Sequence, residues 1–402
     1  MSSPFAGKRV ILGITGGIAA YKVADWVRAL VGEGAVVTVV MTKAAAQFVT
    51  PLTFAALSGQ PVAGDLFAAA GAETIPHIKL ARDCDLLVIA PATANTVARL
   101  AHGLADDLLA AVVLATRAQV AVFPAMNSQM LAHPATQDNL ARLAALGYLV
   151  VEPGCGPLAC GAEGPGRLPD WPAARTWLAA ALTEQDLAGQ VLLVTAGPTQ
   201  EPLDPVRFLS NRSTGKMGYA LAQAARQRGA RVILVSGPSA LPPPVGVELL
   251  RVRTALEMRE AVLAHYQAAS AIVMSAAVSD FRPQAAAGHK LKKSAPGAEL
   301  LELVANPDIL KELGERKGAD PLPLLVGFAA ESDRHLEEGR RKLAAKNLNL
   351  LVVNDIRRPD AGFAADTNQV TILAQGAEPE VLPLLSKEET AHRLLDRLRR
   401  LW

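Results

Sequence analysis

Short, almost continuously apolar runs alternate with stretches of helical periodicity along the first 150 residues. Five of these runs predict strands: 9–13, 36–41, 85–90, 119–123 and 148–151. The stretches between them, beginning with 18–31, predict helices. Strands that are apolar on both faces are typical of a parallel sheet covered by helices on both sides. We therefore predict an amino-terminal, three-layer αβα domain of the flavodoxin or Rossmann type.

The same alternation restarts near residue 190 and predicts a second domain of the same class. Its strands are predicted at 191–195, 231–235, 271–275, 324–327 and 350–353. A run at 369–373 predicts an edge strand, and the pattern over 386–401 predicts a closing helix. We place the boundary so that 1–189 and 190–402 form two three-layer αβα domains, the second also Rossmann-like.

Between the two domains, the segment 152–170 (EPGCGPLACGAEGPGRLPD) has no periodicity and is rich in glycine and proline. A loop of this length within a compact domain is usually functional or disordered. One interpretation is a flap over 153–169 that closes over a site and brings Cys160 to the chemistry. The alternatives are a linker with incidental thiols and a labile bridge between Cys155 and Cys160. A short helix over 171–182 is predicted to follow.

Composition narrows the class of protein. Half of the 402 residues are hydrophobic, which excludes a mostly disordered chain, and 40 basic residues balance 38 acidic ones. This balance gives no reason to expect a nucleic-acid or membrane-surface partner. Three cysteines are too few for a disulfide scaffold and favour the cytoplasm. No apolar run reaches the about 18 residues of a membrane-spanning helix. Glycines interrupt the apolar stretch after Arg9, so we expect no signal peptide.

Open α/β sheets bind ligands beyond the carboxyl ends of their strands, so the residues there are candidates. The first predicted strand runs into GITGGIAA at 13–20, where glycines and a helix start suit a phosphate. A tight turn is the alternative, since the segment is neither GxGxxG nor a P-loop. Asn127 follows the fourth strand and could donate to a carboxylate without ion pairing.

His77 is a candidate because it follows Pro76, which fits the first position of a helix. A cation is disfavoured there, so the imidazole should be neutral and able to accept a proton or bind a substrate. A structural histidine is the alternative. The adjacent acids Asp106 and Asp107 are equally well explained as a helix cap and a solvated face.

Together, residues 10–170 resemble the cysteine-decarboxylating flavoproteins of coenzyme A biosynthesis. The resemblance rests on motifs in the right order: GITGGIAAYK (13–22), TIPHIKL around His77, APATANT (90–96), GLADDLL (103–109), PAMNSQM (124–130) and LACGAEGPGR (158–167). It departs from the family at Leu131 and Ala162, which concerns the fit of the flap.

This resemblance implies bound FMN and the decarboxylation of 4′-phosphopantothenoylcysteine. It implies that His77 lies near flavin and substrate, that Asn127 binds the departing carboxylate, and that Cys160 donates the proton of the final reduction. The implied flavin contacts are Thr15, Gly16, Gly17, Ile18, Ala19, Thr42, Thr93, Ala94, Asn95 and Asp106.

The second half places further candidates after its strands. The loop 196–218 (AGPTQEPLDPVRFLSNRSTGKMG) ends at a helix start and suits an anion or a carbonyl, with an ordinary loop as the alternative. Asp280 could reach a ribose or a metal, and Phe328 could stack on a base. The basic run KLKK at 290–293 could equally be a solvated face, and Lys342 and Lys346, four residues apart, could simply extend along the surface.

Residues 191–400 resemble the bacterial phosphopantothenate–cysteine ligase, through the loop just named and the motifs AAVSDF (276–281), KLKK, NPDIL (306–310), GFAAE (327–331) and KNLNLLVVND (346–355). The resemblance implies CTP and Mg²⁺, an acyl-cytidylate formed with loss of pyrophosphate, and its aminolysis by cysteine. It implies that Asn211 contacts the acyl intermediate, that Asp280 holds nucleotide and metal, and that Lys290 binds nucleotide and supports the second step. The other implied nucleotide contacts are Ala276, Pro307, Asp308, Ile309, Leu310, Phe328, Lys342 and Lys346.

Our hypothesis is therefore one chain with two consecutive activities, in which the ligase product is the decarboxylase substrate. The alternatives are a chain with only one working half, a flavin-binding regulatory subunit and a relative of the prenyl-flavin synthases. The resemblance also implies a homo-oligomer, with decarboxylase trimers building a dodecamer, ligase dimers, and flavin sites at subunit interfaces.

Overall fold

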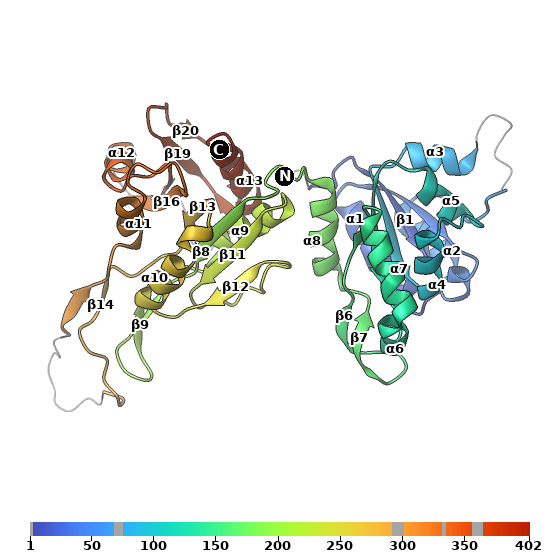
Figure 1. Cartoon of the computed structure of the whole chain (residues 1–402), viewed down its shortest axis with the longest axis horizontal. Helices are drawn as coiled ribbons and strands as arrows, with labels where there is room; N and C mark the ends of the chain where they lie inside the picture. The colour runs from blue at the N-terminus through green and yellow to red at the C-terminus, as the bar shows by residue number, and fades with distance from the viewer. Residues whose placement is uncertain (1–2, 68–74, 292–300, 332–334, 356–364) are drawn as a thin grey trace. The chain divides into compact units, whose positions relative to one another are not determined.

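The computed structural model describes residues 3–67, 75–291, 301–331, 335–355 and 365–402 (Figure 1). The chain divides into two compact units that meet between Glu184 and Gln185. The boundary predicted at 189, from the restart of the strand–helix alternation, lies inside the second unit. The reason is that Leu187 is fully buried in the core of that unit, and the carboxylate of Asp186 pairs with Arg228 at 2.6 Å.

The amino-terminal unit contains a five-stranded, all-parallel sheet in the order β2-β1-β3-β4-β5, which confirms the predicted fold class. The strands are β1 (Arg9–Ile14), β2 (Val36–Met41), β3 (Leu86–Ala92), β4 (Gln119–Pro124) and β5 (Leu149–Val150). The helices are α1 (Ala20–Gly32), α2 (Pro51–Ser58), α3 (Pro76–Arg82), α4 (Ala94–Ala101), α5 (Leu108–Ala115), α6 (Ser128–Ala132), α7 (Pro134–Ala145) and α8 (Trp171–Leu182).

Both faces of this sheet are buried. Neighbouring residues of a strand point to opposite faces, so each strand supplies side chains to both. On β1, Leu12 packs into the cluster that contains Trp26 of α1 and Leu178 of α8. Its neighbour Ile11 packs into the second cluster, which contains Leu109 of α5. The two clusters explain why the strands are continuously apolar in sequence, as expected for the middle layer of a three-layer domain.

The glycine-rich segment is a β-hairpin rather than an irregular loop. Strands β6 (Gly154–Pro157) and β7 (Glu163–Arg167) pair antiparallel. The hairpin lies against the start of α6, where Met126 N donates to Gly166 O at 3.0 Å and Ser128 Oγ donates to Pro165 O at 2.7 Å. Gly166 has φ +129°, and a Cβ there would lie 2.1 Å from Met126 O, so only glycine fits. The strands were missed because glycine and proline carry no alternation.

The carboxyl-terminal unit contains an eight-stranded sheet in the order β12-β11-β8-β13-β16-β17-β19-β20. The strands are β8 (Val191–Ala196), β11 (Arg231–Ser236), β12 (Glu248–Arg251), β13 (Ala271–Met274), β16 (Leu324–Glu331), β17 (Leu350–Asp355), β19 (Val370–Ala374) and β20 (Glu380–Val381). Strand β19 runs antiparallel to both of its neighbours, so the sheet is mixed.

The prediction of an edge strand at 369–373 was wrong in one respect. Strand β19 lies between β17 and β20, and the edges are β12 and β20. Both edge strands are short, with the sequences ELLR and EV, so they lack the apolar run on which the prediction depended. Only the pairing with β11 and β19 identifies them as strands.

Helices cover both faces of this sheet as well. They are α9 (Lys216–Gln227), α10 (Ala255–Ala264), α11 (Ile309–Lys317), α12 (His335–Ala345) and α13 (Lys387–Arg399). Leu221 of α9 and Leu394 of α13 pack into one cluster, and Met258 of α10 and Leu313 of α11 pack into the other. Three two-stranded sheets lie outside the main sheet: β9 (Gln200–Pro202) with β10 (Phe208–Ser210), β14 (Phe281–Pro283) with β15 (Leu303–Ala305), and β18 (Thr367–Asn368) with β21 (Leu385–Ser386).

No helix within the described residues combines the length and the apolar character needed to cross a membrane.

Candidate active sites

The loop after β1 is held against the loop after β3 by a buried threonine. The Thr15 hydroxyl donates to Pro91 O at 2.5 Å and accepts from Thr93 N at 3.2 Å. Gly16 packs so closely on Ala44 that an added Cβ would lie 2.4 Å from the alanine Cβ. Thr42 N donates to Ile14 O at 3.1 Å, which places the end of β2 beside the same loop. These contacts bring the loop 15–19 together with Thr42 and the start of α4.

Two helices begin at this edge of the sheet. Helix α4 starts with Ala94 and Asn95, and its N-cap Thr93 accepts from Thr96 N at 3.3 Å. Helix α1 is 13 residues long, starts after Ala19 without a side-chain cap, and has no acidic residue in its first turn. Its first backbone N–H groups and its dipole therefore favour an anion such as a flavin phosphate. The residues present fit a bound FMN at this edge.

Asp106 lies on the segment between α4 and α5. Its carboxylate pairs with Arg99, near the far end of α4, and 74% of its side chain is exposed. Asp107 pairs with Arg99 at 2.9 Å and also caps α5, accepting from Ala110 N at 2.9 Å. The sequence left open whether these two acids cap a helix or lie on the surface. In the structure Asp107 caps α5, and both acids pair with Arg99.

Asn127 and Cys160 are brought into contact. Asn127 caps α6 through a bond from Gln129 N, and its Nδ2 donates to Cys160 Sγ at 3.4 Å. Cys160 lies exposed in the turn of the hairpin, where Leu158 N donates to Ala162 O. A hydrogen bond from the backbone of Ala162, and then the Asn127 amide, lower the pKa of the Cys160 thiol. Cys155 and Cys160 are both free thiols, so the bridge considered from the sequence is not present.

His77 is not brought to this pair within one chain. It is the second residue of α3, which leads into the amino end of β3, whereas Asn127 follows the carboxyl end of β4. Figure 1 shows α3 at the opposite end of the unit from α6 and the β6–β7 hairpin. The Nδ1 atom of His77 is buried and has no hydrogen-bond partner among the described residues.

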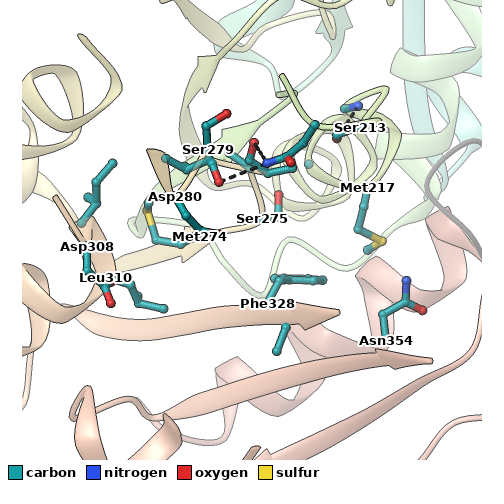
Figure 2. A pocket seen from close by; sticks show the side chains of 18 of the residues that line it. Ser213, Met217, Met274, Ser275, Ser279, Asp280, Asp308, Leu310, Phe328 and Asn354 are labelled. Carbon is teal, nitrogen blue, oxygen red and sulfur yellow. Dashed lines mark hydrogen bonds between the residues drawn. The ribbon is translucent and has the colours of Figure 1, made fainter. Parts of the chain in front are cut away.

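In the carboxyl-terminal unit, loops that follow several strands enclose a cavity of about 720 Å³ (Figure 2). Nearly every site residue predicted for this half lines it: Asn211, Ala276, Asp280, Pro307, Asp308, Ile309, Leu310, Phe328, Lys342 and Lys346. In Figure 2, Phe328 on β16 lies between Asp308 and Leu310 on one side and Asn354 on the other. An aromatic face in this place can stack on a planar base.

Hydrogen bonds fix several of these side chains. Asn211 Nδ2 donates to Ala277 O and Val278 O, both at 3.1 Å, which joins the loop before α9 to the loop after β13. Asp308 caps α11 through a bond from Lys311 N at 3.0 Å, and its other oxygen pairs with Lys346 Nζ at 2.8 Å. Lys346 is thereby held at the mouth of the cavity, although part of its charge is already neutralised.

Lys290 is the exception among the predicted residues. It is exposed and does not line the cavity. It lies on the segment between β14 and β15, and the two remaining lysines of the KLKK motif, Lys292 and Lys293, fall outside the described residues.

The structure also adds residues that sequence reasoning did not assign. Lys216, Asn354, Asn368 and Lys387 line the cavity. Lys216 pairs with Asp366 at 2.6 Å, and Lys387 donates to the backbone oxygens of Ala365 and Thr367. Burial, and then the proximity of Lys216, lower the pKa of Lys387. Lys216 belongs to the loop 196–218, which the sequence indicates as a candidate anion site. Lys387 is about 170 residues further along the chain, and no motif around it indicates that it lines this cavity.

Two family models match the chain in succession. The model described as Flavoprotein matches residues 2–181, and the model described as DNA/pantothenate metabolism flavoprotein C-terminal domain matches residues 187–401. Together they account for both compact units.

Curated relatives match over nearly the whole length. The coenzyme A biosynthesis bifunctional proteins CoaBC of Bacillus subtilis and Escherichia coli K12 are each 47% identical, over 97% and 98% of this chain and 96% and 97% of theirs. A crystal structure of the C-terminal domain of such a protein is 42% identical, covers 54% of this chain and 98% of that one, and has a TM-score of 0.47. An FMN-dependent cysteine decarboxylase structure is 35% identical over 44% of this chain and 97% of that one, with a TM-score of 0.39.

Both family models and the full-length relatives therefore agree with the two-unit architecture. The chain belongs to the family of bifunctional coenzyme A biosynthesis proteins, which unite phosphopantothenoylcysteine decarboxylase and phosphopantothenate–cysteine ligase in one polypeptide.

Proposed function

We propose that the carboxyl-terminal unit uses CTP to join cysteine to 4′-phosphopantothenate, and that the amino-terminal unit uses FMN to decarboxylate the product. The observation that carries the proposal is the single cavity of about 720 Å³ in which Asn211, Asp280, Phe328 and Lys342 meet. These residues lie on four different segments of the chain. They supply an amide, a carboxylate, an aromatic ring and a cation. That set suits a nucleotide beside an acyl group.

In the first step of ligation, a carboxylate oxygen of 4′-phosphopantothenate attacks the α-phosphorus of CTP, and pyrophosphate leaves. Phosphoryl transfer of this kind is accelerated mainly by position and by charge. Lys342 and Lys346 supply positive charge, and the backbone of 307–310 contacts the nucleotide at the start of α11. Phe328 stacks on the cytosine, and Ala276 lines the same wall.

Mg²⁺ fits this site as a partner of Asp280 and the phosphates, where it would neutralise charge on the triphosphate. The described residues contain no group of three or more His, Cys, Asp or Glu side chains placed to hold a metal ion. Mg²⁺ commonly takes only one or two carboxylates together with substrate phosphates and waters. Two carboxylates line the cavity, and because Asp308 is paired with Lys346 at 2.8 Å, Asp280 is the one placed to bind the ion.

In the second step, the amine of cysteine attacks the acyl carbon, CMP leaves, and the amine proton is lost as the amide forms. Asn211 has both amide protons engaged by Ala277 O and Val278 O, so it offers Oδ1 to the acyl intermediate or to the incoming amine. Lys290, which does not itself line the cavity, would reach CTP when the nucleotide is bound and would support this step by stabilising the negative charge that develops when CMP leaves.

In the amino-terminal unit, the FMN contacts are the loop Thr15–Ala19 together with Thr42, Thr93–Asn95 and Asp106. Bound FMN would supply the oxidation that makes the carboxylate a good leaving group and the later reduction. The Asn127 amide donates to the substrate carboxylate, which an uncharged group can hold and still release as carbon dioxide. Cys160 delivers a proton in the final reduction, and its lowered pKa makes the proton readily available. His77 lies near flavin and substrate and orients the substrate.

The separation of His77 from Asn127 supports a shared site. Because α3 and the hairpin lie at opposite ends of one unit, we propose that a second copy brings its His77 to the Asn127 and Cys160 of the first. We propose decarboxylase trimers with flavin at the subunit interfaces, built into a dodecamer, and ligase units that dimerise. A buried imidazole nitrogen without a partner in the described chain accords with a site that is incomplete in one copy.

The direct test supplies 4′-phosphopantothenate, cysteine and CTP to the purified full-length protein. We expect a yellow protein with a flavin spectrum, release of carbon dioxide, and 4′-phosphopantetheine thiol. Amide formation without carbon dioxide would leave only the ligase half working. A yellow protein that forms neither product would instead indicate a flavin-binding regulatory subunit.

A further inference from the structure

A buried carboxylate lies in the turn between β9 and β10, outside the cavity. Asp204 is 3% exposed, and its Oδ1 accepts from Val206 N at 2.8 Å and Arg207 N at 2.7 Å. Its Oδ2 accepts from Arg207 Nε at 2.9 Å and Nη2 at 2.6 Å. The Arg207 guanidinium holds the pKa of this carboxyl far below its usual range, so Asp204 is ionised at every working pH.

The same carboxylate also reaches a distant segment. Leu291 N donates to Asp204 Oδ2 at 3.1 Å, and Arg207 Nη2 donates to Leu291 O at 2.7 Å. Four residues earlier, Ala287 N donates to Leu203 O at 2.9 Å. Both ends of the segment 287–291 are thus tied to the turn 203–207, and Lys290 is the residue just before the second tie.

The turn is joined rigidly to the residues around Asn211. Strand β10 pairs with β9, and Ser210 Oγ donates to Thr199 O at 2.8 Å one residue before Asn211. The contacts of Asp204 with Val206 and Arg207 would suffice to close the turn by themselves. The two bonds to Leu291 are additional, and they connect the Asn211 loop to the exposed segment that carries Lys290.

An exposed connecting segment is ordinarily among the least stable parts of a domain. A buried charge must keep its hydrogen-bond partners, because leaving them unmade is strongly disfavoured. The ionised Asp204 therefore gives the segment 287–291 a fixed base, and the position of Lys290 relative to Asn211 follows from that base.

We propose that Asp204 is a positioning residue for amide formation, which holds the base of the Lys290 segment in register with the Asn211 loop. This inference rests on the proposed role of Lys290 in the second step. Asp204 does not touch substrate; it acts through Leu291 and Arg207 on the segment from which Lys290 extends.

The test measures the two half-reactions separately in the full-length protein. Asp204→Asn keeps the shape of the side chain but removes its charge. We expect pyrophosphate release from CTP and 4′-phosphopantothenate, without cysteine, to remain near the wild-type rate. Cysteine-dependent amide formation should fall about tenfold to a hundredfold, as misplacement of a reacting group commonly costs. Backbone hydrogen exchange over 285–291 should become faster.

Two further variants separate positioning from stability. Leu291→Pro removes the N–H that reaches Asp204 and leaves the Asp204–Arg207 pair intact, so it should reproduce the same selective loss even if Asp204→Asn does not fold. Asp186→Asn removes a second nearly buried carboxylate of the same unit, paired with Arg228 at 2.6 Å and remote in sequence from the segment. It should leave the ratio of the two half-reactions unchanged.

Equal loss of both half-reactions in Asp204→Asn and Leu291→Pro, or unchanged exchange over 285–291, would overturn the inference. A Lys290→Gln variant distinguishes failure of the Asp204 inference from failure of the proposed function of Lys290. If Lys290→Gln forms amide normally, the role given to Lys290 is wrong, and with it the positioning role of Asp204. Faster exchange in Asp204→Asn would then show only that the tether exists.

Discussion

Both units place many of their candidate residues in loops at the carboxyl ends of parallel strands, but they present them differently. In the carboxyl-terminal unit, Asn211, Asp280, Phe328 and the lysines of α12 and the following turn line one cavity. In the amino-terminal unit, Asn127 and Cys160 meet on an exposed surface, and α3, the helix that carries His77, lies at the opposite end of the unit (Figure 1). One site is enclosed by its own chain, and the other is open.

The difference follows from how each unit uses its loops. Long connections after β8 and β13 are bonded to each other through Asn211, so they close over the sheet edge of the carboxyl-terminal unit. In the amino-terminal unit, the long connection forms the β6–β7 hairpin, which packs on α6 and leaves Cys160 at its exposed tip. The comparison teaches that a site is enclosed where its loops are bonded to one another, and that it stays exposed where the long loop packs on a helix instead.

The largest expected effect concerns sharing of the open site. Cys160→Ser should lower formation of 4′-phosphopantetheine from supplied 4′-phosphopantothenoylcysteine by about a thousandfold, within the range for a lost acid–base group. His77→Asn should lower it by about a hundredfold or more, as misplacement of a substrate does. Chains carrying one or the other substitution, when co-expressed, should recover activity, because an intact His77 meets an intact Cys160 across the interface. Thiol product of the purified mixture is the measurement.

Co-expression of His77→Asn with the double variant supplies the control, because no chain in that mixture has His77. Absence of recovery in the first mixture, with mixed oligomers present by mass spectrometry, would place the whole site within one chain.

The next prediction tests whether the enclosed site works independently of the open site. Asn211→Asp should slow amide synthesis about a hundredfold or more, as loss of a preorganised polar contact does. A carboxylate cannot donate to Ala277 O and Val278 O, and it adds negative charge beside the acyl phosphate. Decarboxylation of supplied 4′-phosphopantothenoylcysteine should be unchanged. Asn349→Asp, whose partner Lys317 lies 2.6 Å away, makes the same substitution elsewhere in the unit and should have little effect on either activity. Loss of both activities in Asn211→Asp would show that the units are coupled.

A stability measurement compares the two cores. Gly218 on α9 approaches β8 so closely that an added Cβ would lie 2.5 Å from Ala196 Cβ. Gly218→Ala should therefore destabilise the carboxyl-terminal unit by about 1–3 kcal/mol, the usual cost of overpacking. Gly32 of α1 has no atom within 4 Å of the added Cβ, so Gly32→Ala should stabilise the amino-terminal unit slightly, by up to about 1 kcal/mol. Denaturation followed by circular dichroism measures both, and equal stability of the two variants would contradict the close packing of α9.

The smallest effect tests the contact between Asn127 and Cys160. Since the pKa of Cys160 is lowered, its thiolate forms, and reacts with iodoacetamide, at lower pH than an ordinary thiol. Asn127→Ala removes one of the hydrogen bonds that favour the thiolate, so the alkylation profile should move to higher pH. Cys84, whose pKa is raised by burial, serves as an internal comparison that reacts at higher pH in both proteins. An unchanged Cys160 profile would mean that the amide does not stabilise the thiolate.

Local patterns predicted most of the scaffold. The strand at 36–41 and the helix at 171–182 have the predicted bounds, because each is a continuous run whose periodicity is set by its own residues. The β6–β7 hairpin and the edge strands β12 and β20 escaped prediction. Their strand character depends on partners across the sheet rather than on apolar alternation along the chain.

The candidate chemistry divides in the same way. Separated motifs identified the residues that line the ligase cavity, because those residues lie in the loops that follow recognisable strands. They did not indicate Lys216 and Lys387 as neighbours, nor the bond between Asp204 and Leu291, 87 positions apart in sequence.

The sequence by itself determined that there are two three-layer αβα domains and which kinds of reactive group they contain. The reason is that periodicity and apolar character are properties of short segments. Which groups meet was decided only by tertiary structure, because contact between remote residues depends on how strands are ordered and loops are packed. It joined Asn127 to Cys160 and placed α3, the helix that carries His77, at the opposite end of the unit.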